Sequence, residues 1–206
     1  MSEGMAADLP QIDDERMARL HGRLVERAAR SADLDVAYRV IDSPLGRLVL
    51  AATPRGLVRV GFADVEGEER VLAEVAREVS PKVLRSPGRL DKAAQQVEEY
   101  LAGRRSGFEI ALDLSLLGGF RGEVVTALPR IPYGSTASYG ELAAIVERPR
   151  AVRAVGTACA TNPLPLLLPC HRVVRADGSP GRYRGGDSAK VALLEMESRG
   201  GSAADR

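Results

Sequence analysis

The stretch from Asn162 to Val174 constrains the fold of this chain more than any other. It reads Asn-Pro-Leu-Pro-Leu-Leu-Leu-Pro-Cys-His-Arg-Val-Val. Three prolines within seven residues exclude a helix, because each proline lacks a backbone N–H and restricts the residue before it. The sequence therefore predicts a stiff, extended, apolar segment that delivers Cys170 to a fixed place.

Cys170 is followed directly by His171, a base of the kind that a reactive cysteine needs. Only a few per cent of free thiols are ionised at neutral pH, and the thiolate is the form that attacks. Adjacent side chains on extended backbone point to opposite faces, so we expect a bridging water or a sharp bend between the two. The alternative role, a small buried hydrophobe, is the commoner one for an isolated cysteine and fits Cys159, which lies in a predicted helix.

Composition limits the class of protein. At 206 residues, with 45% hydrophobic and 28% charged residues, the chain fits one globular domain or two small ones. It contains no apolar run near the roughly 20 residues that span a bilayer, and residues 1–15 do not resemble a secretory signal. Two cysteines fit a reducing compartment, and the distance of His21 from His171 in the sequence argues against zinc. These features predict a cytoplasmic protein with no membrane partner and no metal.

Charge is informative locally. The whole chain carries 29 basic and 28 acidic residues, so it exerts no strong overall pull on polyanions. Between residues 147 and 184, seven arginines face only two acidic residues: Arg148, Arg150, Arg153, Arg172, Arg175, Arg182 and Arg184 against Glu147 and Asp177. Such a basic segment favours contact with phosphates, although an arginine-rich genome explains it equally well.

The first half of the chain predicts a small antiparallel sheet with helices. Short β-rich runs separated by proline and glycine turns predict a three-stranded meander, at 36–42, 47–52 and 57–62. Helical spacing of apolar residues predicts helices over 71–79 and 90–101. Alternation of Phe108, Ile110, Leu112 and Leu114 predicts one more strand.

The second half predicts mostly helices. An apolar stripe indicates a helix over Phe120–Leu128. Ser138 and Glu141 have the spacing of a capping box, in which each side chain satisfies a free backbone N–H, and they start a helix that continues to Val146.

A second helix follows almost at once. Pro149 suits the first position of a helix that runs to about Ala160. Two helices joined by so tight a turn predict a helix-turn-helix, with Arg150 and Arg153 at the start of its second helix. Such pairs also occur as plain packing units.

These patterns predict an α+β fold in four segments. They are an N-terminal extension (1–34), an α+β domain with a small antiparallel sheet (35–117), a mostly helical domain with the reactive residues (118–198) and a flexible tail (199–206). Within the extension, Asp13 suits the cap of a helix with an apolar stripe of Met17, Leu20, Leu24 and Ala28. A weakly packed arm is favoured over a partner-binding helix.

A family resemblance covers roughly Ser43 to Glu197. Pro169-Cys170-His171-Arg172-Val173, preceded by Asn162-Pro163, resembles the active-site signature of the methylated-DNA–protein-cysteine methyltransferases, which repair 6-O-alkylguanine. Further matching motifs follow the same order: Ile131–Gly134, Ser138–Ala143, Arg153–Gly156, Tyr183–Gly186, and finally Lys190 and Glu197.

The resemblance implies a reaction and a partner. A damaged guanine is flipped out of double-stranded DNA, and Cys170 attacks its alkyl carbon and keeps the group. One turnover per molecule is expected, with no cofactor. The protein is expected to be a monomer in solution, and cooperative assembly on DNA stays open, as does the size of the alkyl groups accepted.

The resemblance also implies roles for the residues around Cys170. His171 would take the thiol proton through a water, and Glu197 would hold the imidazole tautomer. Tyr139 would donate a hydrogen bond to the leaving guanine, and Asn162 would fix the turn before the reactive loop. The walls of the base pocket would be formed by Val173, Tyr183, Arg184 and Lys190.

A further set of residues would contact DNA. Arg153 would enter the vacated base stack, and the helix that carries it would lie in the minor groove. Ala151, Ala154 and Gly156 fit close approach to that groove, or equally tight helix packing. Arg150 and Arg172 join the set from the basic segment.

The chain departs from the family pattern at Arg182 and Asp187, which leaves the pocket rim open. Two other functions compete with this interpretation. A lesion sensor that accepts no alkyl group would lack the cysteine. A cysteine hydrolase would need an oxyanion hole, for which the sequence gives no signal.

Overall fold

The computed structural model describes residues 13, 16–17, 19–20, 22–23 and 34–204, with side chains through Gly200. It divides into two units, residues 1–34 and 35–206. In the first unit, the Asp13 carboxylate accepts a hydrogen bond from the backbone N–H of Arg16 at 2.6 Å, which confirms the predicted cap. Three residues of the sequence argument lie outside the described residues: His21, Leu24 and Ala28.

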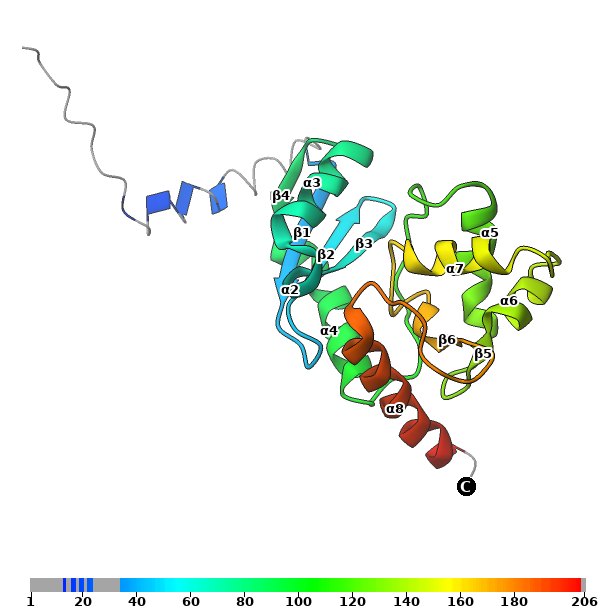
Figure 1. Ribbon diagram of the computed structural model, residues 1–206. Helices are drawn as coiled ribbons and strands as arrows, with labels where there is room; N and C mark the ends of the chain where they lie inside the picture. The colour runs from blue at the N-terminus through cyan, green and yellow to red at the C-terminus, as the bar shows by residue number, and fades with distance from the viewer. Residues whose placement is uncertain (1–12, 14–15, 18, 21, 24–33, 205–206) are drawn as a thin grey trace, which may run out of the picture. The chain divides into compact units, whose positions relative to one another are not determined.

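A four-stranded sheet forms the first half of the second unit (Figure 1). Its strands are β1 (Val36–Ile41), β2 (Leu48–Thr53), β3 (Gly56–Phe62) and β4 (Val83–Arg85), in the order β3-β2-β1-β4. The first three form the predicted antiparallel meander, whereas β4 pairs parallel to β1. Three residues are too few to show a period-2 pattern, so β4 could not be predicted from local alternation.

Both helices predicted for this half are confirmed. The helical segments are α2 (Ala63–Glu66), α3 (Glu68–Glu78), the 3-10 helix η1 (Pro87–Leu90) and α4 (Asp91–Leu101). A Cβ atom on Gly61 would come within 2.6 Å of Val71, so this glycine lets α3 lie close to β3. The close packing brings Glu66 and Glu74 beside Arg59, which β3 contributes.

The strand predicted over 108–114 is wrong. This segment makes one isolated parallel bridge, between Leu57 and Leu112, and no ladder. Further along β3, the N–H of Val60 donates to the carbonyl of Pro163 at 2.9 Å, so the reactive loop occupies the edge where a longer strand would pair. The alternation reflects one-sided packing, as in the contact of Phe108 with Tyr100 at a centroid distance of 4.8 Å.

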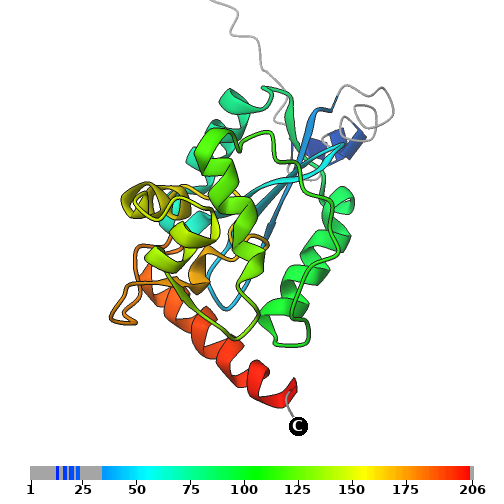
Figure 2. The ribbon, with the colours of Figure 1, turned by 90° about the vertical axis from the view of Figure 1, so that its right-hand side faces the viewer.

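The second half is mostly helical, as predicted. Its elements are α5 (Gly119–Ala127), η2 (Leu128–Arg130), β5 (Ala137–Ser138), α6 (Tyr139–Ile145), α7 (Val152–Ala160), η3 (Cys170–Arg172), β6 (Val173–Val174) and α8 (Gly186–Ala204). The capping box is confirmed: Glu141 N–H donates to Ser138 Oγ at 3.1 Å, and Ser138 N–H donates to Glu141 Oε2 at 2.6 Å. Figure 2 faces these helices, with α8 descending from them.

The second of the paired helices begins later than predicted. α7 starts at Val152, so Pro149 and Arg150 lie in the preceding turn. The reason is the end of α6, where Glu147 adopts a left-handed conformation with φ of 57°. Such a residue interrupts helical backbone and lengthens the turn.

Helix α8 continues to Ala204, although the tail was predicted to begin at residue 199. Of the helices that the structure describes, none has the length and apolar character of a membrane span.

Candidate active site

The loop before Cys170 is stiff but folded back on itself, so the prediction of an extended segment is wrong. The side chain of Asn162 closes it: Nδ2 donates to the carbonyl of Leu168 at 2.7 Å, and Oδ1 accepts from the N–H of Leu164 at 2.9 Å. Leu166 adopts a φ of 74°, which turns the chain. The three prolines prevent this loop from forming a helix or strand, so the Asn162 side chain provides hydrogen-bond partners for its backbone groups instead.

Cys170 opens the 3-10 turn η3, which provides a sharp bend directly after the cysteine. Its side chain is buried, and the residue is 2% exposed. Burial raises the pKa of the Cys170 thiol to about 11, against the opposing effects of a hydrogen bond with Asn162 and the charge of Lys190. At neutral pH the group is therefore a thiol, and it needs a base before it can attack.

His171 is positioned to be that base. Its Nε2 lies 2.7 Å from Oε1 of Glu197, a carboxylate that can only accept, so Nε2 carries the proton. Burial lowers the pKa of His171, and Glu197 offsets this only in part. The neutral ring therefore presents a free lone pair at Nδ1, a buried atom with no hydrogen-bond partner among the described residues.

Glu197 is held as an anion by a ring of donors. Arg172 donates to it from Nε at 2.8 Å and from Nη2 at 3.1 Å, and the N–H of Gly134 donates at 3.1 Å. The hydroxyl of Tyr100 donates to Oε1 as well. Burial alone would raise the pKa of Glu197, but the hydrogen bonds from His171 and Arg172 bring it down to about 2.

Tyr100 was missed by the sequence analysis. It lies on α4, is fully buried, and also comes within 3.3 Å of His171 Nε2. Tyr100 lies three residues after Val97, so it shares the apolar face of the predicted helix. A buried tyrosine needs a partner for its hydroxyl, and this was the one available signal.

Tyr139, Val173 and Lys190 lie together on the Cys170 side. Lys190 is fully buried; its Nζ donates to the carbonyl of Val173 at 2.5 Å and lies 5.9 Å from the centre of the Tyr139 ring. Burial raises the pKa of Tyr139, and the nearby Cys159 and Cys170 raise it further. Tyr139 thus keeps its proton at neutral pH, as a donor to a leaving group must.

Tyr183 faces inward. Its ring meets those of His171 and Phe62 edge-on, at centroid distances of 6.2 and 5.5 Å. Its hydroxyl is buried and finds no hydrogen-bond partner in the described part of the chain. With His171 Nδ1, this gives two unpaired polar atoms close to the thiol.

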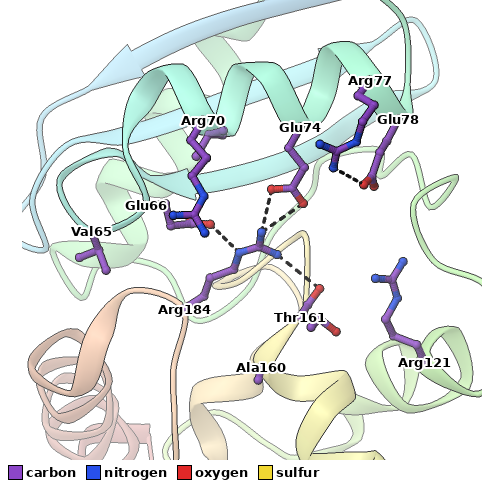
Figure 3. Close-up of a pocket in the computed structure, with 11 residues that line it drawn as sticks. Val65, Glu66, Arg70, Glu74, Arg77, Glu78, Arg121, Ala160, Thr161 and Arg184 are labelled. Atoms are coloured by element: carbon purple, nitrogen blue, oxygen red, sulfur yellow. Dashed lines mark hydrogen bonds and ion pairs between the residues drawn. The ribbon is translucent and has the colours of Figure 1, made fainter.

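Two predicted site residues lie elsewhere. Arg172 is buried, 6% exposed, and its guanidinium binds Glu197 and the carbonyl of Ile131, so it is not a surface contact for DNA. The guanidinium of Arg184 binds Glu66 and Glu74, at the edge of a cavity of about 530 Å³ (Figure 3). A count of charges along the sequence cannot show that Arg172 is buried or that Arg184 pairs with carboxylates.

The remaining candidates for DNA contact lie at the start of α7. Arg153 and Ala154 are exposed there, Arg150 is exposed in the preceding turn, and Ala151 and Gly156 are partly exposed. Arg153 is the second residue of the helix, so its side chain projects from the N-terminal end.

Comparisons with protein families match nearly the whole second unit. Residues 36–114 match the 6-O-methylguanine DNA methyltransferase ribonuclease-like domain. Residues 119–199 match the DNA binding domain of the same family.

Individual relatives agree. The methylated-DNA–protein-cysteine methyltransferase of Mycobacterium tuberculosis (strain H37Rv) is 40% identical over 162 residues, which cover 79% of this chain and 92% of the relative. The inducible enzyme of Bacillus subtilis (strain 168) is 39% identical over 158 residues, covering 76% of this chain and 87% of the relative.

Solved structures extend the likeness to the fold. The crystal structure of Mycobacterium tuberculosis OGT in complex with DNA has a TM-score of 0.68 at 37% identity, covering 80% of this chain and 94% of that one. Sequence and fold thus agree over both halves of the second unit, and its second half carries the thiol, the imidazole and the carboxylate. The chain belongs to the family of methylated-DNA–protein-cysteine methyltransferases.

Proposed function

We propose that this enzyme repairs DNA by direct reversal, transferring the alkyl group of 6-O-alkylguanine in duplex DNA to Sγ of Cys170. The observation that carries the proposal is the polar chain behind the thiol. His171 has its Nε2 bound to Glu197 and its Nδ1 unpaired in the buried site. This arrangement suits a base that accepts one proton from a neighbouring thiol.

The transfer balances without an oxidant or a reductant. The thiol proton passes through a water to Nδ1 of His171, and Glu197 stabilises the imidazolium that forms. Sγ then forms a bond to the alkyl carbon as the bond from that carbon to the guanine oxygen breaks. Tyr139 supplies a hydrogen bond to the departing guanine. The product is a thioether on Cys170, and with no step to cleave it each molecule acts once.

The base reaches Cys170 by leaving the duplex. Unstacking costs a few kcal/mol, and an exposed side chain that fills the gap offsets part of that cost. Arg153 suits this role because it is exposed at the start of α7. Ala154 and Gly156 leave room beside it for a groove wall. We expect the free protein to be a monomer in solution, and cooperative assembly on DNA stays open.

We propose that the flipped guanine enters beside Tyr139. Its ring is half-buried, and Gly181 lies directly against its hydroxyl, where a Cβ atom would overlap. We place the flipped guanine between Tyr139 and the segment from Gly178 to Tyr183. Because Cys170 is covered in the free protein, this segment has to move aside for the guanine to reach Sγ.

Mass spectrometry of the intact protein tests the proposal. After incubation with duplex DNA that contains 6-O-methylguanine, the mass is expected to rise by one methyl group. Peptide mapping should place that group on Cys170. A second addition of DNA should release no further methyl, because the acceptor is used up. Continued turnover would contradict the single-use mechanism.

Arg153→Ala should slow repair of duplex DNA about tenfold, the loss expected when about 1.4 kcal/mol of support for the flipped state is removed. Single-turnover rates on duplex and on single-stranded DNA with the same lesion separate the possible roles. The loss should be confined to the duplex, because a single strand needs no base flipping.

The matched control is Arg77→Ala, which removes an exposed arginine of α3 whose partner is the exposed Glu78. An equal loss on both DNA forms would assign Arg153 to phosphate contact alone. If Arg153→Ala repairs duplex DNA at the wild-type rate, Arg153 has no role in base flipping.

A further inference from the structure

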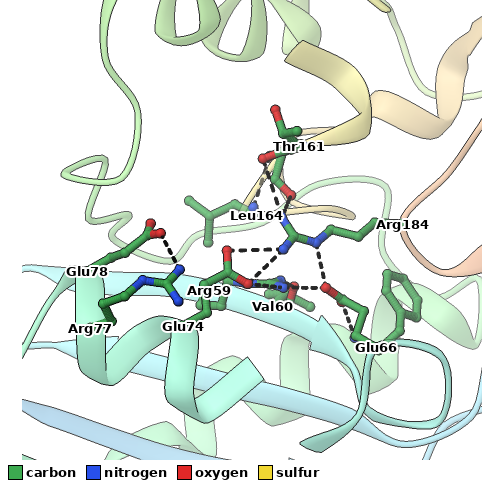
Figure 4. A network of polar contacts seen from close by, with 11 residues as sticks. Arg59, Val60, Glu66, Glu74, Arg77, Glu78, Thr161, Leu164 and Arg184 are labelled. Atoms are coloured by element: carbon green, nitrogen blue, oxygen red, sulfur yellow. Dashed lines mark hydrogen bonds and ion pairs between the residues drawn. The ribbon is translucent and has the colours of Figure 1, made fainter. Parts of the chain in front are cut away.

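Four charged residues, one of them fully buried and three partly buried, form an ionic network between the two halves of the second unit (Figure 4). Arg59 of β3 is fully buried and binds Glu66 at 2.6 Å and Glu74 at 3.4 Å. Arg184 binds the same two carboxylates, at 2.6 Å from Nε and 2.8 Å from Nη2. Two positive and two negative charges thus balance in one cluster, which we call the ionic network.

Arg184 also contacts the start of the reactive loop. Its Nη1 donates to the carbonyls of Thr161 and Asn162 at 3.4 and 3.5 Å. Asn162 is the residue that closes the loop before Cys170, and Tyr183, which faces His171, directly precedes Arg184. One guanidinium therefore connects the first half of the unit with both sides of the site.

The two halves pack together at Phe62 and Tyr183, whose ring centroids are 5.5 Å apart, but not along the edge that Arg184 crosses. The cavity of about 530 Å³ separates them there, lined by α2 and α3 on one side and by Arg121, Ala160, Thr161 and Arg184 on the other. Figure 3 shows Arg184 reaching from one side to Glu66 and Glu74 on the other. Across this space, the contacts of Arg184 with Glu66 and Glu74 connect the two sides.

We propose that Glu66 and Glu74 are positioning residues for the alkyl transfer: through Arg184 they fix Tyr183 and the start of the Cys170 loop relative to each other. This inference rests on the proposed function. Neither carboxylate touches the reacting atoms, and both come from the half of the protein that holds no reactive thiol. A small displacement of reacting groups lowers the reaction rate strongly. Loss of the contact between Arg184 and the two carboxylates should therefore slow the chemical step.

Two substitutions test the network, and one residue offers a matched control. Glu74→Gln keeps the shape of the side chain and removes its charge. Arg184→Lys keeps the charge but loses the planar fork that reaches two carboxylates and two carbonyls. Glu78→Gln is the control, because Glu78 lies on the same helix and lines the same cavity but pairs with Arg77.

Single-turnover methyl transfer from duplex DNA is measured over a range of protein concentrations, so that the maximal rate and the half-saturating concentration are separated. We expect Glu74→Gln and Arg184→Lys to lower the maximal rate at least about tenfold while half-saturation stays within about twofold. Glu78→Gln should match the wild type. A purely structural defect would instead lower the fraction of protein that reacts.

Hydrogen exchange in the free protein gives a readout without DNA. The amide of Gly186, which donates to the carbonyl of Tyr183 at 3.0 Å, should exchange faster in Glu74→Gln than in Glu78→Gln. If Glu74→Gln keeps both the wild-type maximal rate and the wild-type exchange, the inference is overturned. If Glu74→Gln does not fold, Arg184→Lys decides by the same two measurements. Absence of transfer in the wild type would refute the proposed function, while the exchange rates would still decide whether the network holds Tyr183.

Discussion

Cys170→Ala will not gain mass from methylated DNA, however long the incubation. The chain has two cysteines, and the second, Cys159, is buried in α7 with a pKa that burial raises to about 12. Cys159 is followed by Ala160 and not by a histidine base, so we expect that it does not replace Cys170 as an acceptor. The surface around Arg153 is unchanged in this variant, so binding to DNA with the lesion should persist.

The measurement combines intact mass with a gel-shift titration of the same samples. Cys159→Ala is the matched control, a change of the same size in another buried thiol, and it should still gain one methyl group. A mass gain in Cys170→Ala would show that another residue accepts the alkyl group. Loss of DNA binding in that variant would show that Cys170 contributes to the fold or the binding surface instead.

Glu197→Gln should reduce transfer at least about a hundredfold and lower the free energy of unfolding by about 3–5 kcal/mol. The amide can no longer neutralise Arg172, which is left as a buried charge without a carboxylate. It can also donate to His171, so the tautomer that leaves Nδ1 free is no longer fixed. Single-turnover rates and denaturant unfolding measure the two effects separately.

Acid provides an independent check of the same carboxylate. The pKa of Glu197 is about 2 in the folded protein, below its ordinary 4.5. Ionisation thus favours the folded state: the contribution to stability is complete above about pH 4.5 and is lost as the pH falls toward 2. Glu197→Gln should remove this part of the acid dependence.

The control for both measurements is Glu195→Gln, because Glu195 lies on the same helix but is exposed and pairs with Arg199 at 3.4 Å. It should keep the rate, the stability and the acid dependence of the wild type. Equal stability of Glu197→Gln and the wild type at neutral pH would mean that the donors around the carboxylate do not hold the helix in place.

Local rules predicted much of this fold. The meander, the helices and the capping box at Ser138 follow from patterns within a dozen residues, and each is present. The wrong predictions concern segments whose structure depends on more than their own local pattern. The segment 108–114 alternates like a strand, but the loop at Pro163 occupies part of the edge of β3. Pro149 suits a helix start, but the left-handed Glu147 delays α7.

The site divides in the same way. Cys170 and His171 are adjacent in the sequence, and the resemblance supplied Glu197. The apolar face of its helix indicated that Tyr100 is buried, but its partner Glu197 lies 97 residues away, so the contact itself could not be predicted. The ion pairs of Arg172 and Arg184 could not be predicted either, because a count of arginines along the chain does not show which carboxylates they bind.

If Cys170 accepts one alkyl group per molecule, as proposed, its burial has a further consequence. A thiol that is 2% exposed, with a pKa near 11, offers little thiolate to small electrophiles dissolved in the cell. Oxidants and free alkylating agents therefore meet an inert sulfur. In the proposed mechanism, burial therefore keeps the thiol unreacted until a flipped guanine is bound beside it.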